Sequence, residues 1–164
     1  MIRLLIADDH AVVREGLRTI LSSASDIEVV GQAGDGREAV EKALELHPHV
    51  VLMDLRMPQL DGLEATRLIK AQLPATSVIM LTIYEDDSYL IEAIKAGAGG
   101  YLLKDASKDL IIHTIQAVHS GGILVKTSLL REAIASLAGA VERQAREQTG
   151  LEEKFGELTP RERD

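Results

Sequence analysis

Three carboxylates stand directly after apolar runs of this sequence. Asp8 and Asp9 follow the run over residues 2–7, and Asp54 follows the run over residues 49–53. Such apolar flanks favour a buried strand, and burying an unpaired carboxylate costs several kcal/mol. An acid at the end of a strand this apolar therefore needs a partner of opposite charge.

Parallel strands of one sheet end at the same edge, so the three carboxylates converge if the two runs are neighbouring strands. Like charges held that close raise one another's pKa unless a cation compensates them. An all-oxygen site of this kind suits Mg²⁺ or Mn²⁺, with positions left open for water. A carboxylate beside such an ion is a competent nucleophile towards phosphorus. The acids therefore indicate phosphoryl chemistry.

Two further polar side chains end other apolar runs. Thr82 ends a fourth run and offers a hydroxyl, and Lys104 follows a fifth run and offers an ammonium group. A phosphoryl group on Asp54 would need neutral and cationic donors around its oxygens. Each of these residues is weak evidence alone, but their joint placement after separate runs points to one site.

The elements that must position these residues are short strands alternating with helices. Apolar runs with many Val and Ile residues predict strands over residues 2–7, 27–31, 49–53, 76–81 and 99–103. Amphipathic segments predict helices over about residues 10–24, 35–48, 61–74, 85–98 and 107–122. Asp35 and Ser107 are suitable N-caps, and Gly97 suits a helix end. Strict alternation predicts an α/β fold, an open parallel sheet with helices on both faces.

The composition narrows the possible functions. With one Phe, three Tyr and no Trp, the chain lacks aromatic platforms for single-stranded nucleic acid. It has no Cys, which excludes disulfides, thiol nucleophiles and zinc–thiolate sites. The net charge of −8 argues against direct binding to DNA. No apolar stretch is long enough for a membrane span and no signal peptide is recognisable, so we expect a cytoplasmic protein.

Four short segments of the chain resemble the signature of a known family. The segments ADDH, LMDLRMPQLDG, MLT and GYLLKD look like the signature of the response regulator receiver domain of two-component signalling. Within that superfamily the chain is most similar to the NarL/FixJ subfamily. The resemblance covers about residues 1–122 and implies a flavodoxin-like, doubly wound sheet of five parallel strands in a (βα)5 arrangement.

The resemblance implies a role for each acidic position. Asp54 matches the phospho-acceptor, Asp9 matches the direct Mg²⁺ ligand, and Asp8 matches its acidic neighbour. The backbone carbonyl of Arg56, two residues after the acceptor, matches the third protein ligand. All four positions are therefore expected to contribute to a metal site.

The resemblance also implies the residues that respond to phosphorylation. Thr82 and Lys104 match the side chains that bond the phosphoryl group, and Tyr101 matches the aromatic switch residue. The turn over residues 58–62 matches the one that shapes the loop after the acceptor. Asp105 stands where many receivers have a proline after a cis peptide bond, although NarL-like receivers often lack that proline.

The last part of the chain has a different pattern. Residues 123–157 contain no strand pattern, and an apolar stripe from Leu130 to Val141 predicts a linker helix. This helix could pack on its own domain or on a second copy of the chain. Residues 158–164, LTPRERD, resemble the beginning of a LuxR-type helix-turn-helix domain whose remainder is missing.

The leading interpretation is a two-component response regulator and not a turnover enzyme. Asp54 would accept a phosphoryl group from a histidine kinase, hydrolyse it slowly, and so switch a transcription-factor output. We expect a phosphorylation-dependent homodimer that binds DNA only through the missing C-terminal domain, and no membrane partner.

Other interpretations remain open at this point. The chain could be a stand-alone receiver that signals through protein partners, or an aspartyl-phosphate phosphohydrolase. In such hydrolases a second acid usually stands where this sequence has Arg56, so turnover would be slow. Taken alone, Asp8 and Asp9 could simply cap the first helix, and Tyr101 could be plain packing. His10 adjoins the acidic pair and could shape kinase docking.

Overall fold

A computed structural model describes residues 1–83 and 87–121 of the protein. Five strands are present in this part of the chain: β1 (Ile2–Ala7), β2 (Ile27–Ala33), β3 (Val50–Asp54), β4 (Ser77–Thr82) and β5 (Gly100–Leu103). Five helices alternate with them: α1 (Ala11–Leu21), α2 (Gly36–Leu46), α3 (Gly62–Gln72), α4 (Asp87–Lys95) and α5 (Lys108–His119). All ten predicted elements are confirmed, with ends shifted by a few residues.

The five strands form one parallel sheet in the order β2-β1-β3-β4-β5. The predicted flavodoxin-like fold is therefore confirmed. β1 and β3 are neighbours at the centre, with Ala7 opposite Met53, so the residues that follow them leave the sheet side by side. β2 is added on one side of β1, whereas β3, β4 and β5 are added on the other side. Doubly wound folds place their ligands at this change of direction.

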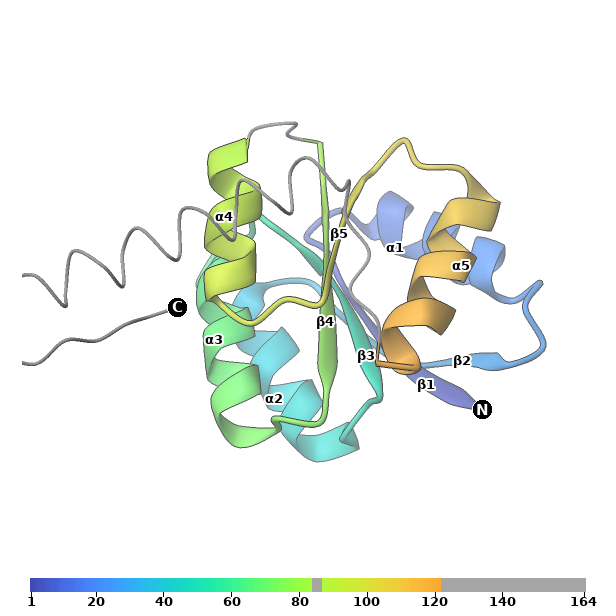
Figure 1. Cartoon of the computed structure of the whole chain (residues 1–164). Coiled ribbons are helices and arrows are strands. Elements are labelled where there is room, and N and C mark those ends of the chain that lie inside the picture. Colours follow the sequence, from blue (N-terminus) through green and yellow to red (C-terminus); the bar gives the residue numbers. More distant parts are fainter. Residues whose placement is uncertain (84–86, 122–164) are drawn as a thin grey trace, which may run out of the picture. The chain divides into compact units, whose positions relative to one another are not determined.

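Two helical layers cover the sheet, with α2, α3 and α4 on one face and α1 and α5 on the other (Figure 1). Side chains alternate between the faces along each strand. In β3, Val51 and Met53 pack towards α2–α4, while Val50 and Leu52 pack towards α1 and α5. Burial on both faces explains why β3 is a continuous apolar run.

The strand β2 differs most from its predicted bounds. It continues two residues further, to Ala33, and a register shift opposite Leu4 and Leu5 interrupts its pairing with β1. β2 is an edge strand with one neighbour, so its middle residues are only partly buried and polar side chains are tolerated there. This partial exposure explains why an apolar pattern underestimates its length.

The helix ends follow the predicted capping residues. The Asp35 and Asp61 carboxylates accept hydrogen bonds from backbone N–H groups in the first turns of α2 and α3, at 2.8 and 2.9 Å. The Ser107 hydroxyl does the same for α5 at 3.1 Å. Gly97 follows α4 with a φ of 103°, a left-handed conformation that costs glycine little.

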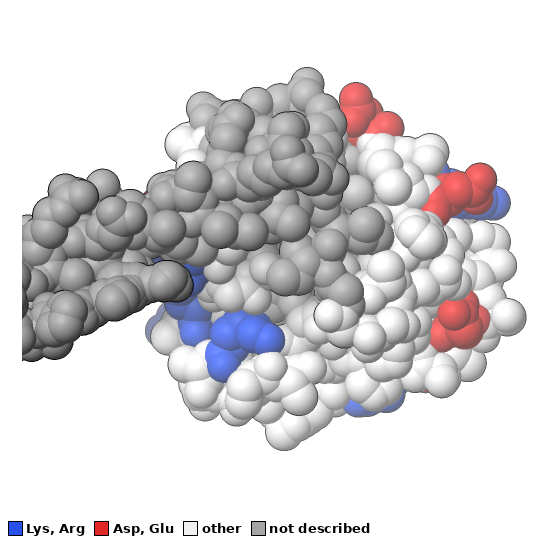
Figure 2. All heavy atoms as spheres, viewed as in Figure 1, with Lys and Arg blue, Asp and Glu red and all other residues white. Residues whose placement is uncertain are grey.

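The predicted linker helix and the LuxR-like ending, residues 123–157 and 158–164, lie outside the described residues. No helix in the described part of the chain is long and apolar enough to cross a bilayer. On the face seen in Figure 2, separate acidic side chains lie on the α1 and α5 side, and basic side chains lie on both sides.

Candidate functional site

Asp54 is the last residue of β3 and lies at the carboxyl edge of the sheet. Like the rest of β3, this side chain is buried, with 7% exposed. Burial, and then the negative charge of Asp8, raise the pKa of Asp54 from its usual 3.8 to about 6, against the opposing effect of Lys104. The ionised form of this carboxylate is therefore destabilised in the folded protein, and a nearby cation would stabilise it.

Asp8 and Asp9 lie beside Asp54 because β1 and β3 are neighbouring strands. The Asp8 side chain is 2% exposed and the Asp9 side chain 30% exposed, so one acid is inside the site and the other at its mouth. α1 takes its N-cap from the next residue, His10, and no side chain caps the helix. Neither Asp8 nor Asp9 is the N-cap residue of α1, so the simple helix-capping interpretation of the two acids is wrong.

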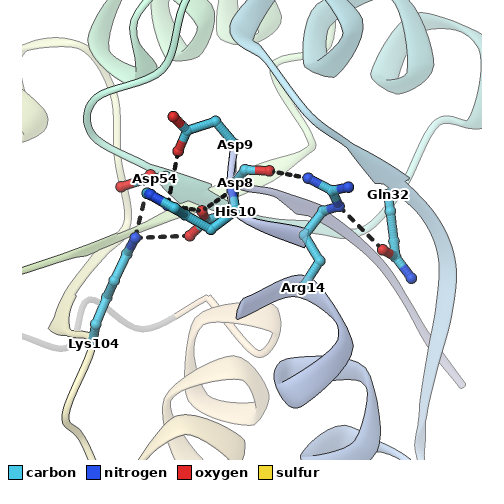
Figure 3. Close-up of polar contacts among 7 residues, drawn as sticks. All are labelled: Asp8, Asp9, His10, Arg14, Gln32, Asp54 and Lys104. Carbon is cyan, nitrogen blue, oxygen red and sulfur yellow. Dashed lines mark hydrogen bonds and ion pairs between the residues drawn. The ribbon is translucent and has the colours of Figure 1, made fainter. Parts of the chain in front are cut away.

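Lys104 comes from the loop after β5 and reaches the same acids. Its Nζ lies 2.8 Å from Asp8 Oδ2 and 3.3 Å from Asp54 Oδ2 (Figure 3). Burial alone would lower the pKa of Lys104, but its hydrogen bond and charge interactions with the two acids outweigh burial and raise it. The Lys104–Asp105 peptide bond is trans. The lysine reaches the site without the proline that many receivers place here.

Thr82 lies on β4, the strand next to that of Asp54, and Tyr101 lies on the edge strand β5. Thr82 ends β4 and is fully buried, and its carbonyl oxygen accepts a 2.7 Å hydrogen bond from the Lys104 backbone N–H. Tyr101 is half-buried in β5, opposite Met80, and packs against the cluster on the α2–α4 side of the sheet. Thr82 therefore lies between the strand of Asp54 and the edge strand that carries Tyr101.

The loop after Asp54 is anchored by a close backbone approach. The Gly62 N–H donates a 2.8 Å hydrogen bond to the Leu55 carbonyl oxygen. A β-carbon at Gly62 would collide with the carbonyl oxygen of Asp54. Glycine is therefore required here so that α3 can begin directly against the end of β3.

The side chain of Arg56 leads from this loop to α4. Its Nη2 donates a 2.5 Å hydrogen bond to the Tyr89 hydroxyl, and the guanidinium lies 5.6 Å from the centre of the Tyr89 ring. The predicted metal-binding group of Arg56 is its backbone carbonyl, which no contact in the structure tests. The side chain itself links the loop after Asp54 to α4.

Two further residues contact the acids. The sequence alone does not identify Arg14, and it assigns His10 no role in the acidic cluster. The Arg14 guanidinium donates to the Asp8 carbonyl oxygen and, at 3.2 Å, to Gln32 Oε1. His10 Nδ1 lies 3.2 Å from Asp8 Oδ1 and 3.0 Å from Asp9 Oδ1. A basic residue near the start of a helix is unfavourable towards the helix dipole, so Arg14 could have been noticed on that ground.

The donor set fits a divalent cation. One carboxylate oxygen each from Asp8, Asp9 and Asp54, together with a ring nitrogen of His10, lie within 4.8 Å of one another. Among residues 1–83 and 87–121, this is the one such group of metal-ligating side chains. Oxygen donors from three carboxylates suit Mg²⁺ or Mn²⁺, with water completing the coordination shell.

Comparison with known proteins points in the same direction. The profile of the response regulator receiver domain family matches residues 4–116. The transcriptional regulatory protein LnrK of Bacillus subtilis is 45% identical over 134 residues, which is 82% of this chain and 61% of that protein. The chain thus spans about three fifths of the length of this curated relative.

Solved structures agree with the sequence comparison. A LuxR-family two-component response regulator from an Aurantimonas species is 30% identical, with a TM-score of 0.76 over 83% of this chain and 97% of that one. The isolated REC domain of RcsB from Salmonella enterica, solved in the presence of the phosphomimetic BeF3-, is 28% identical. Its TM-score is 0.71, over 79% of this chain and 96% of that one.

Proposed function

Since this chain belongs to the response regulator receiver family of two-component signalling, we propose that Asp54 is its phospho-acceptor and a histidine kinase its donor. One observation carries the proposal: Asp8 and Asp9, which follow β1, and Lys104, which follows β5, gather around Asp54, the last residue of the buried strand β3. A structural ion pair would need only one acid for Lys104, whereas two acids pair with it and a third, Asp9, lies beside them.

In the proposed reaction a carboxylate oxygen of Asp54 attacks the phosphorus of a phosphohistidine. The new O–P bond forms as the P–N bond breaks, and the leaving imidazole takes up a proton. Burial raises the pKa of Asp54, which means that its ionised form is poorly stabilised in the folded protein. Once a cation is bound nearby, Asp54 is ionised and is a suitable nucleophile. The product is an acyl phosphate in the same pocket.

Asp8, Asp9, Asp54 and the backbone carbonyl of Arg56 would hold a divalent cation, Mg²⁺ or Mn²⁺. When bound, that ion neutralises charge on the transferring phosphoryl group. Lys104 now pairs with Asp8 and Asp54, so its ammonium group is within reach of phosphoryl oxygens placed on Asp54. Lys104 would therefore pair with carboxylates before phosphorylation and with the phosphoryl group afterwards.

Thr82 and Tyr101 would carry the signal away from the acceptor. The Thr82 hydroxyl bonds the phosphoryl group, and its movement frees space into which Tyr101 turns. This is supported by the fully buried Thr82 at the end of β4 and by the half-buried Tyr101 on the edge strand β5. The change would reach the surface of α4, β5 and α5.

The output would be control of transcription by a phosphorylation-dependent homodimer in the cytoplasm. The relative LnrK is named a transcriptional regulatory protein, and the chain spans 61% of it. In our proposal, DNA is bound only through a C-terminal domain, and residues 123–157 and 158–164 are the linker and the start of that domain. The receiver hydrolyses its own acyl phosphate slowly, because Arg56 stands where phosphohydrolases place a second acid.

The test is labelling by a small phosphodonor. Purified protein is incubated with acetyl phosphate and Mg²⁺, and the intact mass and the modified peptide are then measured. We expect one added phosphoryl group, on Asp54, and none in Asp54→Asn. Asp61→Asn is the matched control, since this acid lies in the same loop but caps α3, and asparagine caps as well as aspartate.

Two results would overturn the proposal. Equal labelling of Asp54→Asn and the unaltered protein would place the acceptor elsewhere. Labelling that persists unchanged in a chelator would remove the divalent cation from the reaction.

A further inference from the structure

His10 places an imidazole nitrogen inside the acidic cluster. Its Nδ1 lies 3.0 Å from Asp9 Oδ1 and 3.2 Å from Asp8 Oδ1, and its backbone N–H donates a 2.9 Å hydrogen bond to Asp8 Oδ1 (Figure 3). The ring is thus drawn back over the two acids, although its side chain is 66% exposed and solvent is available to it.

The separation of His10 Nδ1 and Asp9 Oδ1 matches that of two neighbouring ligands of one ion. Two neighbouring ligand atoms, each about 2.1 Å from an octahedral ion, lie about 3.0 Å apart. His10 Nδ1 and Asp9 Oδ1 have this separation, and the oxygens of Asp8 and Asp54 complete a set within 4.8 Å. The same spacing suits a direct contact between imidazole and carboxylate, so the ring needs little movement to become a ligand.

We propose that His10 Nδ1 is a protein ligand of the cation site, and that it makes the site prefer a borderline transition ion over Mg²⁺. The inference deepens the proposed function and rests on it. Imidazole binds Ni²⁺, Cu²⁺ and Zn²⁺ well, whereas Mg²⁺ takes oxygen donors and keeps its water. A set of three carboxylates and one imidazole therefore favours the transition ions.

A helix-capping role does not explain the position of the His10 ring. His10 is the N-cap residue of α1, yet its side chain makes no capping hydrogen bond to the helix. The ring instead contacts the two acids that the proposed function assigns to the cation. Packing does not hold the ring there either, because most of it is exposed.

The experiment compares ions by isothermal titration. Mg²⁺ and Ni²⁺ affinities are measured for the full chain and for His10→Ala and His10→Gln. All proteins carry His119→Ala, because the His49 and His119 rings are 5.0 Å apart and could bind nickel themselves. We expect both His10 variants to lose about tenfold or more in Ni²⁺ affinity and less than about twofold in Mg²⁺ affinity.

A matched control and a spectroscopic readout accompany the titration. His113→Ala removes another exposed histidine, on α5, and is expected to change neither affinity. With Cu²⁺ as the probe, electron paramagnetic resonance should show coupling to an imidazole nitrogen that disappears in His10→Ala. Thermal unfolding of each variant shows whether it is folded.

The outcomes separate this inference from the proposed function. If the His10 variants bind both ions as the unaltered protein does, or gain or lose affinity for both equally, the inference is overturned. Labelling of Asp54 with Mg²⁺ would then still stand. If neither ion binds and Asp54 is not labelled, the proposed function itself fails.

Discussion

At the scale of single residues, the site is a balance between buried acids and one ammonium group. Asp54 has a raised pKa because burial and Asp8 act more strongly than Lys104. Lys104 has a raised pKa because its two acidic partners outweigh its burial. Without a second cation the pocket therefore holds more negative charge than Lys104 compensates. This excess is what a divalent ion or a proton would relieve.

This balance predicts how Asp54 affects stability. Its pKa of about 6 lies above the ordinary 3.8, so between these values the folded protein binds more protons than the unfolded chain. The unaltered protein should then lose stability as the pH rises from about 4 to about 6, and remain less stable above that range. In a chelating buffer at about pH 7.5, Asp54→Asn should raise the free energy of unfolding by about 2 kcal/mol.

Urea unfolding at several pH values measures this effect. The greater stability of Asp54→Asn should disappear near pH 4, because Asp54 is then protonated in the folded, unaltered protein and is as uncharged as asparagine. Asp61→Asn, at an exposed cap, should not gain the stability at neutral pH that Asp54→Asn gains. A variant Asp54→Asn that is less stable at neutral pH would show that the carboxylate is compensated already.

At the scale of elements, the site depends on how tightly loops close against strand ends. α3 begins against the carbonyl of Asp54, and α2 begins where Gly36 approaches the Leu60 carbonyl in the same loop. The Arg14 guanidinium ties α1 to the Asp8 carbonyl, and the Lys104 backbone is tied to Thr82. Close approaches to backbone carbonyl groups thus help to hold the region around Asp54 in place.

The glycine at the start of α3 gives a prediction at this scale. Gly62→Ala should lower the free energy of unfolding by about 3 kcal/mol, because its β-carbon would meet backbone that cannot turn aside. It should also slow labelling of Asp54, whose carbonyl must shift. Chemical unfolding and phosphodonor labelling report the two effects separately.

Gly16→Ala is the matched control for this substitution. Gly16 is exposed in α1, and no atom lies within 4 Å of the β-carbon it would gain. Alanine is the better helix former, so this variant should be more stable by about 0.5–1 kcal/mol and label normally. Equal destabilisation by both substitutions would contradict the close approach at Gly62.

At the scale of the whole molecule, the strand order connects the acidic cluster to one edge of the sheet. β3 lies at the centre with Asp54, β4 follows with Thr82, and β5 forms the edge with Tyr101 (Figure 1). A change at Asp54 has therefore to pass through only one strand to reach an edge. That edge, with α4 and α5 beside it, is where we place the switching surface.

Light scattering tests the switch on the whole chain. We expect the protein to gain mass towards a dimer when beryllium fluoride and Mg²⁺ are added, and to lose it when they are removed. Asp54→Asn should not respond, and Tyr101→Ala should respond less while Asp54 is still labelled. A dimer fraction that is the same with and without the phosphoryl mimic would contradict phosphorylation-dependent pairing.

Much of this architecture follows from local patterns. Alternating apolar runs and amphipathic segments predict all ten described elements, and the caps at Asp35, Asp61 and Ser107 lie where side-chain chemistry requires them. These features depend on residues close together in the chain, so sequence is sufficient to predict them. The acids were placed correctly at strand ends for the same reason.

Other features depend on contacts between residues far apart in the sequence. Sequence alone allowed β1 and β3 to be neighbours but did not require it, because strand order is decided by packing across the whole sheet. The reach of Lys104 to Asp8, the hold of Arg14 on the Asp8 carbonyl and the turn of His10 towards the acids likewise arise only in the folded chain. Local patterns set which groups stand at the strand ends, and tertiary packing decides which of them meet.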